Sequence, residues 1–205
     1  MLWFYRFYAM IISRTVIFSL CLILFTALPA SAEVYHNQDV GIDFPDSVGE
    51  LVRNPEVTDY EKLVPGLGES IAYNSEGVTS TIYIYRIGQN MSPDESGAVR
   101  IQDHLVAAVG EIMKMQEAGM YQNVALLAAG EFPWQDKLKP TKSLFAKLSY
   151  QQNGTDRLSY LHVLGYRGRV LKVRHTFGSD FYQKGEELHL DLLRMIGRQL
   201  TEATQ

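Results

Sequence analysis

Three consecutive strand-like segments in the last third of the chain limit what it can fold into. Residues 143–150, 157–164 and 169–177 are rich in β-branched, aromatic and other apolar side chains. They are separated by an Asn-Gly pair at 153–154 and by a Tyr-Arg pair at 166–167 that lies between two glycines. Such pairs suit two-residue hairpin turns, so we expect an antiparallel meander of three strands.

This meander has two apolar faces. With two-residue turns, Gln152 pairs with Thr155 and Gly165 pairs with Gly168, and side chains alternate between the faces. One face carries Leu144, Ala146, Leu148, Leu161, Val163 and Val170, with Ser159, Lys172 and Arg174 toward one end. The other face carries Phe145, Leu158, Tyr160, His162, Leu164, Leu171, Val173, His175 and Phe177, together with Lys147 and Arg169. Because large bare apolar patches are rare on soluble monomers, both faces must be covered.

Two segments are predicted to be helices that provide this cover. The sequence SPDE at 92–95 supplies a capping hydroxyl, a proline at the first helical position and a glutamate that can reach back to the cap. A helix is therefore expected from Pro93 to a stop at Gly119, and apolar spacing predicts a second helix at about 180–200. The predicted fold class is α+β, with an antiparallel β-sheet covered by helices on both faces, an α/β/α sandwich.

The first half of the domain contributes shorter extended segments. From apolar runs and Pro/Gly breaks we expect a strand at 40–44, a weaker extended segment at 51–60, a loop at 65–68, and a hairpin formed by 70–74 and 78–87.

The N-terminal 32 residues have the pattern of an export signal. Arg6 and Arg14 precede an uncharged apolar run at 15–28, and the small-residue triplet ASA at 30–32 matches a cleavage site. We predict cleavage after Ala32 and a single globular α/β domain at 33–205 that is periplasmic or extracellular. An uncleaved anchor is an alternative because the uncharged stretch is almost long enough to span a bilayer. A start at Met10 instead of Met1 is also open.

Composition excludes several classes of function. The single cysteine, Cys21, lies in the predicted leader, so the mature domain has no thiol for redox chemistry or thiolate metal binding. Removing Arg6 and Arg14 with the leader leaves 17 basic and 23 acidic residues, a net charge of −6. This balance argues against nucleic acid as a partner, and it leaves the signal segment as the contact with a membrane.

The order of the predicted elements resembles a known family. The residues that carry the resemblance are VGIDFP at 40–45, TIYIY at 81–85, one long helix, and GRVLKVR at 168–174. This pattern is similar to the α/β/α sandwich proteins typified by PsbP and Mog1. The resemblance implies an accessory or binding protein, and it assigns no functional residue.

Histidines are the clearest candidates for metal binding or acid–base chemistry, and they lie at 36, 104, 162, 175 and 189. In the expected register His162 and His175 share a face but lie about 13 Å apart, at ~3.3 Å per residue. Because ligand nitrogens lie about 2 Å from a metal, one ion cannot bind both, and each is interpreted as a hydrogen-bonded sheet residue. Glu186 and His189 have the i, i+3 spacing of di-iron bundles, but a second such pair is missing. We interpret them as part of a solvated helix face.

Motifs for nucleophilic catalysis and dinucleotide binding match only in part. The sequence GESIA at 68–72 has alanine where a nucleophile elbow needs glycine, and it leads from a loop into a strand. The glycines at 66 and 68 are not followed by a helix that could receive a phosphate. No catalytic residue, metal site or cofactor is assigned.

Aromatic and polar side chains supply the candidate binding residues. Lys147, Tyr160 and His162 share one face of the meander, and Trp134 follows Phe132 and Pro133 in a segment expected to be an exposed recognition loop. The aromatic residues Tyr83, Tyr85, Tyr121, Tyr160, Tyr166 and Trp134 either line a pocket or partner surface, or pack in the core with their hydroxyls at its rim. Core packing is the favoured interpretation.

These observations favour a non-catalytic exported binding or accessory protein whose partner is an unidentified protein or small molecule. The alternative is an extracytoplasmic hydrolase with an unrecognised Ser, His and carboxylate grouping, which would need a deep cleft around residues such as Lys147, Tyr160 and His162. A third possibility is an envelope factor held by an uncleaved leader.

Overall fold

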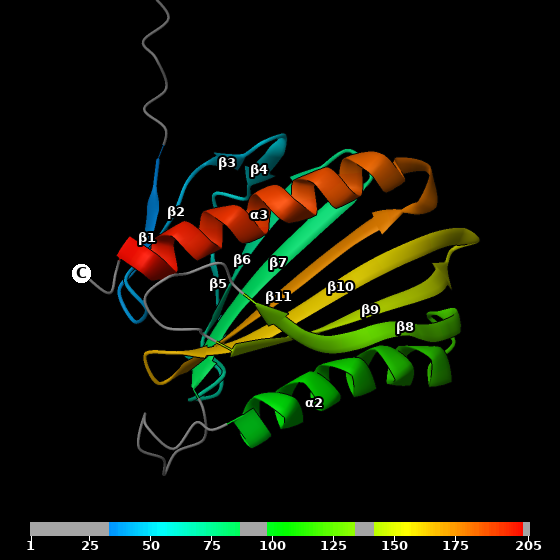
Figure 1. Ribbon diagram of the computed structural model, residues 1–205, viewed down its shortest axis with the longest axis horizontal. Helices are drawn as coiled ribbons and strands as arrows, with labels where there is room; N and C mark the ends of the chain where they lie inside the picture. Colours follow the sequence, from blue (N-terminus) through cyan, green and yellow to red (C-terminus); the bar gives the residue numbers. More distant parts are fainter. Residues whose placement is uncertain (1–32, 87–97, 134–141, 203–205) are drawn as a thin grey trace, which may run out of the picture. The chain divides into compact units, whose positions relative to one another are not determined.

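One antiparallel sheet of nine strands dominates the structure (Figure 1). The computed structural model describes residues 33–86, 98–133 and 142–202, which belong to the unit formed by residues 33–205. Eight strands follow the order β3-β4-β6-β7-β11-β10-β9-β8, and β5 pairs with β6. The strands are β3 (Ser47–Val48), β4 (Leu51–Arg53), β5 (Thr58–Asp59), β6 (Glu69–Ser75), β7 (Val78–Arg86), β8 (Gln122–Pro133), β9 (Lys142–Gln152), β10 (Thr155–Tyr166) and β11 (Arg169–Gly178).

The remaining described elements are a small hairpin and the helices. Strands β1 (Tyr35–Asn37) and β2 (Ile42–Phe44) form a separate two-stranded sheet. Helix α2 (Ala98–Glu117) packs against β8, β9 and β10. After the short 3₁₀ turn η2 (Ser179–Phe181), helix α3 (Tyr182–Glu202) packs against β2, β3 and β11. None of the helices in these described segments is long and apolar enough to cross a membrane.

The predicted meander is present, and its first turn has the expected register. Gln152 pairs with Thr155, and the turn residues Asn153 and Gly154 have φ of 53° and 76°, as a type I′ turn requires. The second turn was misplaced by one residue. Tyr166 pairs with Arg169, so the turn residues are Arg167 and Gly168, both with positive φ. The expected pairing of Gly165 with Gly168 is therefore wrong. The turn needs glycine at its second central position, so Gly168 lies inside the turn and not in the strand that follows it.

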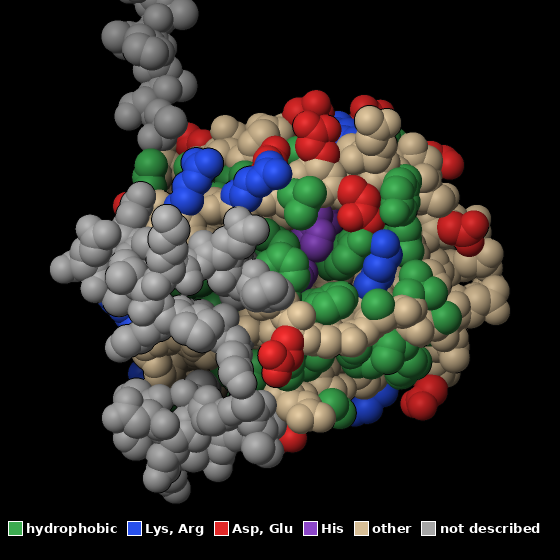
Figure 2. All heavy atoms as spheres, in the orientation of Figure 1, with side chains coloured by type: hydrophobic (Ala, Val, Ile, Leu, Met, Phe, Trp, Pro, Cys, Tyr) green, Lys and Arg blue, Asp and Glu red, His purple; other side chains and the backbone are tan. Residues whose placement is uncertain are grey.

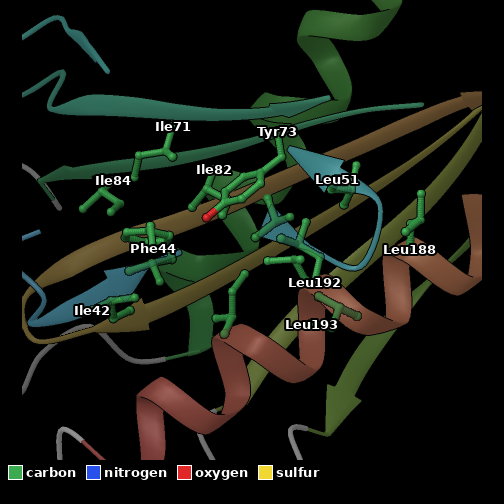
Figure 3. Packing of buried hydrophobic residues seen from close by; sticks show 14 of the residues in the cluster. Ile42, Phe44, Leu51, Ile71, Tyr73, Ile82, Ile84, Leu188, Leu192 and Leu193 are labelled. Atoms are coloured by element: carbon green, nitrogen blue, oxygen red, sulfur yellow. The ribbon is translucent and has the colours of Figure 1, made fainter. Parts of the chain in front are cut away.

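The two apolar faces of the meander are confirmed by the two hydrophobic clusters. Alternating residues of β10 belong to different clusters, Tyr160 and Leu164 to one, Leu161 and Val163 to the other. The first and larger cluster joins the sheet to α3 and to the β1–β2 hairpin (Figure 3). Its members include Ile42, Phe44, Leu51, Ile71, Tyr73, Ile82, Leu188 and Leu192. The second cluster joins β9, β10 and β11 to the buried stripe of α2.

The predicted α/β/α sandwich is wrong. The structure is a largely antiparallel β protein whose described residues form one nine-stranded sheet and only two long helices, not helical layers over both faces. Part of the larger cluster is closed by the β1–β2 hairpin and the β3–β4 turn, which carry Val40, Phe44 and Leu51. The prediction assigned all of the cover to the two helices, and it expected a strand at 40–44 without giving that segment a covering role.

Strand β8 was not predicted, and it corrects the recognition-loop prediction. Phe132 and Pro133 end this edge strand instead of lying in an exposed loop, and Trp134 lies outside the described residues. The predicted helix start at Pro93 also lies outside them, whereas the stop at Gly119 agrees with the end of α2 at Glu117. Leu126 and Leu127 are 50% and 52% exposed, and most of the other β8 side chains are exposed too, so β8 lacks the buried face that makes a strand recognisable in sequence.

Candidate functional site

Three of the predicted binding residues come together on the face of the sheet that α3 crosses. Lys147 on β9 pairs with Tyr160 on β10, and the Lys147 ammonium lies 4.8 Å from the centre of the Tyr160 ring. Glu186 of α3 joins them, because its Oε1 accepts from the Tyr160 hydroxyl at 2.6 Å and lies 3.2 Å from Lys147 Nζ. His162 follows on the same face of β10 and is 1% exposed.

Three histidines form a buried cluster beside this ion pair. Nε2 of His162 and Nε2 of His189 are 3.0 Å apart, so one ring donates to the other. His175 donates from Nε2 to the Gly185 carbonyl at 2.9 Å, which leaves its Nδ1 to accept from the Ser80 hydroxyl at 2.7 Å. In the space-filling view, histidine is visible between hydrophobic side chains near the middle of the face crossed by α3 (Figure 2).

Burial keeps this cluster uncharged. Loss of hydration lowers the pKa of His162 to about 3, of His175 to about 4 and of His189 to about 2. Burial and the hydrogen bond to Glu186 raise the pKa of Tyr160 to about 12. Burial opposes the charge on Lys147, but its contacts with Tyr160 and Glu186 raise its pKa overall. At neutral pH the histidines and Tyr160 are neutral and Lys147 is a cation, each engaged in an internal contact.

Two expectations about these histidines are corrected by the structure. His162 pairs with Val173, two residues from His175, so their separation along the strands is about 7 Å at ~3.3 Å per residue, not 13 Å. The misplaced second turn caused this error. His189 is 4% exposed, so the solvated-face interpretation of the Glu186 and His189 pair is wrong for the histidine. The prediction that His162 and His175 are hydrogen-bonded sheet residues is confirmed.

Among the described residues, no group of three His, Cys, Asp or Glu side chains is placed to hold a metal ion. The three histidines form a hydrogen-bonded part of the core between the sheet and α3.

The opposite face of the sheet carries two neighbouring pockets that share Tyr83, and the first of them lies beside α2. Helix α2 packs mainly against β8, β9 and β10, and side chains of the neighbouring strands β7 and β11 line both pockets. We call these two pockets the α2 groove. Its first part has a volume of about 320 Å³ and is lined by Tyr60, Leu67, Tyr83, Tyr85, His104, Ala107, Ala108, Glu111 and Lys172.

This first part of the groove combines aromatic walls with one ion pair. Lys172 lies 4.5 Å from the centre of the Tyr83 ring and 3.3 Å from Glu111 Oε2. The Tyr85 hydroxyl lies 3.3 Å from His104 Nδ1. Burial raises the pKa of both Tyr83 and Tyr85, so their hydroxyls stay protonated.

The second part of the α2 groove shares Tyr83 with the first and is more polar. It has a volume of about 260 Å³ and is lined by Thr79, Thr81, Tyr83, Tyr121, Tyr150, Gln152, Arg174 and Thr176. Its charged residue, Arg174, donates from Nη2 to the hydroxyls of Tyr121 and Tyr150, each at 3.2 Å.

Three of the tyrosines that line the groove could be singled out in the sequence, but the groove itself could not be located. Tyr83, Tyr85 and Tyr121 were considered as pocket residues, but core packing was favoured. Tyr83 and Tyr85 are partly exposed, because α2 packs mainly against β8–β10 and covers β7 and β11 less completely. The spacing of residues along β7 and β11 places them on one face, but only the position of α2 shows which part of that face is uncovered.

The described residues have a PsbP-like fold. The structure is similar to the solution structure of cyanobacterial PsbP from Synechocystis sp. PCC 6803, with a TM-score of 0.51 and 14% identity over 83% of this chain and 91% of that chain. The resemblance to PsbP indicated by the order of elements is thus confirmed for the fold.

Two other solved structures show weaker likeness. They are PA94 of Pseudomonas aeruginosa, a protein of unknown function (TM-score 0.39, 12% identity, 79% of this chain and 93% of that chain), and LpqN of Mycobacterium tuberculosis, which is involved in cell envelope biogenesis (0.38, 13%, 84% and 88%). No protein-family model matches the sequence, and no curated protein matches it.

Proposed function

We propose that this protein is an exported, non-catalytic binding or accessory protein that holds a small, largely apolar ligand in the α2 groove. The observation that carries this proposal is the aromatic first part of the groove, where Tyr60, Tyr83 and Tyr85 line a concave surface that no described residue fills. Small-molecule sites are typically concave and mainly apolar, with a few polar groups that orient the ligand. Here Lys172 and Glu111 supply such polar groups.

The histidine cluster supports a binding role over the alternative of hydrolysis. A general base must reach substrate and must titrate near the working pH. His162, His175 and His189 are each at most 4% exposed, and burial holds their pKa values far below neutrality. The Ser80 hydroxyl, bonded to His175, is buried as well.

An uncharged fluorescent probe, N-phenyl-1-naphthylamine, tests the groove. Its emission rises when it leaves water for an apolar site, and we expect saturable binding by the folded protein. Leu67, which lines the groove and is 52% exposed, should contribute about 1 kcal/mol, so Leu67→Ser should weaken binding by about fivefold.

Leu190→Ser is the matched control, because Leu190 is similarly exposed but lies on α3, away from the groove. Its affinity for the probe should equal that of the wild type. The proposal fails if the wild-type protein does not bind the probe, or if both leucine variants weaken binding equally.

We further propose that the chain is exported and cleaved after Ala32. The positive residues, apolar run and ASA triplet at 30–32 support this step.

Intact-mass analysis of the exported product tests this cleavage. We expect the mass of residues 33–205. Ala32→Tyr should block processing, whereas Ser31→Tyr should be processed normally, because the middle position of an A-x-A site accepts varied residues. A product that still carries the apolar run would show instead that the leader is a retained anchor.

A further inference from the structure

A partly buried arginine without a carboxylate partner lies in the second part of the α2 groove. Arg174 is on β11, and its hydrogen-bond partners are the hydroxyls of Tyr121 and Tyr150. No Asp or Glu of the described segments forms an ion pair with it, although Arg53, Lys147, Arg169 and Lys172 each have one. In this respect Arg174 differs from Arg53, Lys147, Arg169 and Lys172.

The Tyr150 hydroxyl does not neutralise this charge. Burial raises the pKa of Tyr150, so its phenol keeps its proton at neutral pH. A neutral hydroxyl that accepts from the guanidinium still has its own proton to donate to a ligand. Taking a cation out of water is costly unless an anion or several acceptors compensate it. The pocket thus holds a positive charge that lacks an anion.

The other residues around Arg174 are hydrogen-bonding groups without charge. Thr81 is its cross-strand neighbour on β7, and Thr176 follows it on the same face of β11. With Thr79 and Gln152 they line the pocket, and none of the lining residues is acidic. Hydroxyls and the amide can both donate and accept, which suits the hydroxyl groups of a sugar better than a bare inorganic ion. The volume of about 260 Å³ is close to the lower end of small-ligand pockets.

We propose that this pocket binds an acidic sugar, with Arg174 receiving the carboxylate and the threonine and glutamine side chains receiving the sugar hydroxyls. A planar guanidinium suits a carboxylate because its donors lie in a fork that matches the two oxygens. The inference rests on the proposed function in one respect, since both treat the open face beside α2 as a ligand-binding surface. It names a different part of that surface and a different ligand chemistry.

Titration with sodium glucuronate tests the inference, followed by NMR of the arginine Nε–H signals. We expect the Arg174 signal to shift and glucuronate to bind at least tenfold more tightly than glucose, which lacks the carboxylate. Raising the salt concentration from 50 to 500 mM should weaken glucuronate binding, because screening reduces the attraction between charges. Sodium sulfate is the comparison ligand, because it is an oxyanion without sugar hydroxyls. It should bind at least tenfold more weakly than glucuronate.

Arg174→Gln should reduce glucuronate affinity at least tenfold. Arg169→Gln is the matched control, because Arg169 lies on the same strand but pairs with Asp39 outside the groove, and its affinity should stay within twofold of wild type. Arg174 also donates to two tyrosine hydroxyls, so its replacement could disturb the pocket itself. Thr81→Val is therefore a second variant. It removes one hydroxyl without touching the charge and should weaken glucuronate binding about threefold.

Equal affinity for glucuronate and glucose would overturn the inference, as would an unchanged affinity in both Arg174→Gln and Thr81→Val. Sulfate binding as tight as glucuronate would overturn the sugar assignment. If N-phenyl-1-naphthylamine binds and glucuronate does not, this inference fails while the proposed apolar ligand stands. If glucuronate binds through Arg174 and the uncharged probe does not, the inference is supported and the proposed apolar ligand is contradicted.

Discussion

At the scale of residues, the molecule keeps three histidines neutral inside its core. His162, His175 and His189 come from β10, β11 and α3, and each has a hydrogen-bond partner within the cluster or its surroundings. The His189 ring stacks on Tyr160 with their centroids 4.1 Å apart. Neutral imidazoles can take part in such packing, whereas a charged ring at the same place would lose its hydration, and the nearby Glu186 carboxylate is already paired with Lys147 and Tyr160.

This burial predicts a marked loss of stability in mild acid. The unfolded chain binds protons at these histidines with a pKa near 6.5, whereas the folded protein resists protonation until about pH 4 or below. Protonation therefore favours the unfolded state. The free energy of unfolding should be highest above pH 6.5 and should fall as the pH drops from 6.5 toward 4, with a slope that approaches about 1.4 kcal/mol per pH unit for each histidine that stays neutral in the folded protein.

Urea denaturation at pH 7.5, 6.5, 5.5 and 4.5 measures this dependence. Leu190→Ser is the control, because Leu190 is an exposed residue of α3 that does not titrate, and its replacement should leave the slope unchanged. A free energy of unfolding that stays constant between pH 7.5 and 4.5 would show that the cluster accepts protons in the folded state.

At the scale of elements, the position of α3 depends on the close approach of one glycine to the sheet. A Cβ on Gly185 would lie 2.3 Å from the Phe177 ring, and the Gly185 carbonyl accepts the hydrogen bond from His175. The helix thus sits directly on β11 at this point. Gly110 of α2 is the opposite case, because a Cβ there would meet nothing within 4 Å.

Replacing these two glycines by alanine should change the free energy of unfolding in opposite directions. Alanine favours a helix over glycine by about 1 kcal/mol. Gly110→Ala should therefore stabilise the protein by about 0.5–1 kcal/mol. Gly185→Ala should destabilise it by about 1–3 kcal/mol, because overpacking against Phe177 outweighs the helical preference. Thermal and urea unfolding measure both changes. If Gly185→Ala were as stabilising as Gly110→Ala, the helix would not be in contact with Phe177.

At the scale of the whole molecule, the two sides of the sheet differ in how they are closed. The larger cluster uses α3 and the β1–β2 hairpin, and it encloses the histidines. The smaller cluster is closed by α2 over β8, β9 and β10, which leaves the groove above β7 and β11. Within the described residues, one long helix, α2, packs on this side, and the candidate binding surface lies over the strands that it covers less completely.

Much of this arrangement could be predicted because its signals are local. The alternation of side chains at 143–177 assigned both faces of the meander, and the Asn153-Gly154 turn has the expected register. Strand β8 was not predicted because its run of Val, Ala and Leu does not alternate between apolar and polar residues. An edge strand whose side chains are mostly exposed does not need such alternation. Lys147, Tyr160 and His162 were grouped correctly on one face, whereas Glu186 and His189 could join them only through the packing of α3.

The amino-acid sequence by itself determined which segments form the strands of the meander and which form the two long helices. It also determined which side chains of the meander share a face. Both follow because hydrophobic periodicity and turn chemistry act over a few neighbouring residues. Only the tertiary structure decided which parts of those faces are covered. The depth of the histidines, the contacts of Glu186 and the open groove around Tyr83 and Arg174 all depend on where α2, α3 and the first hairpin pack. Such packing joins residues far apart in the chain, and no local pattern specifies it.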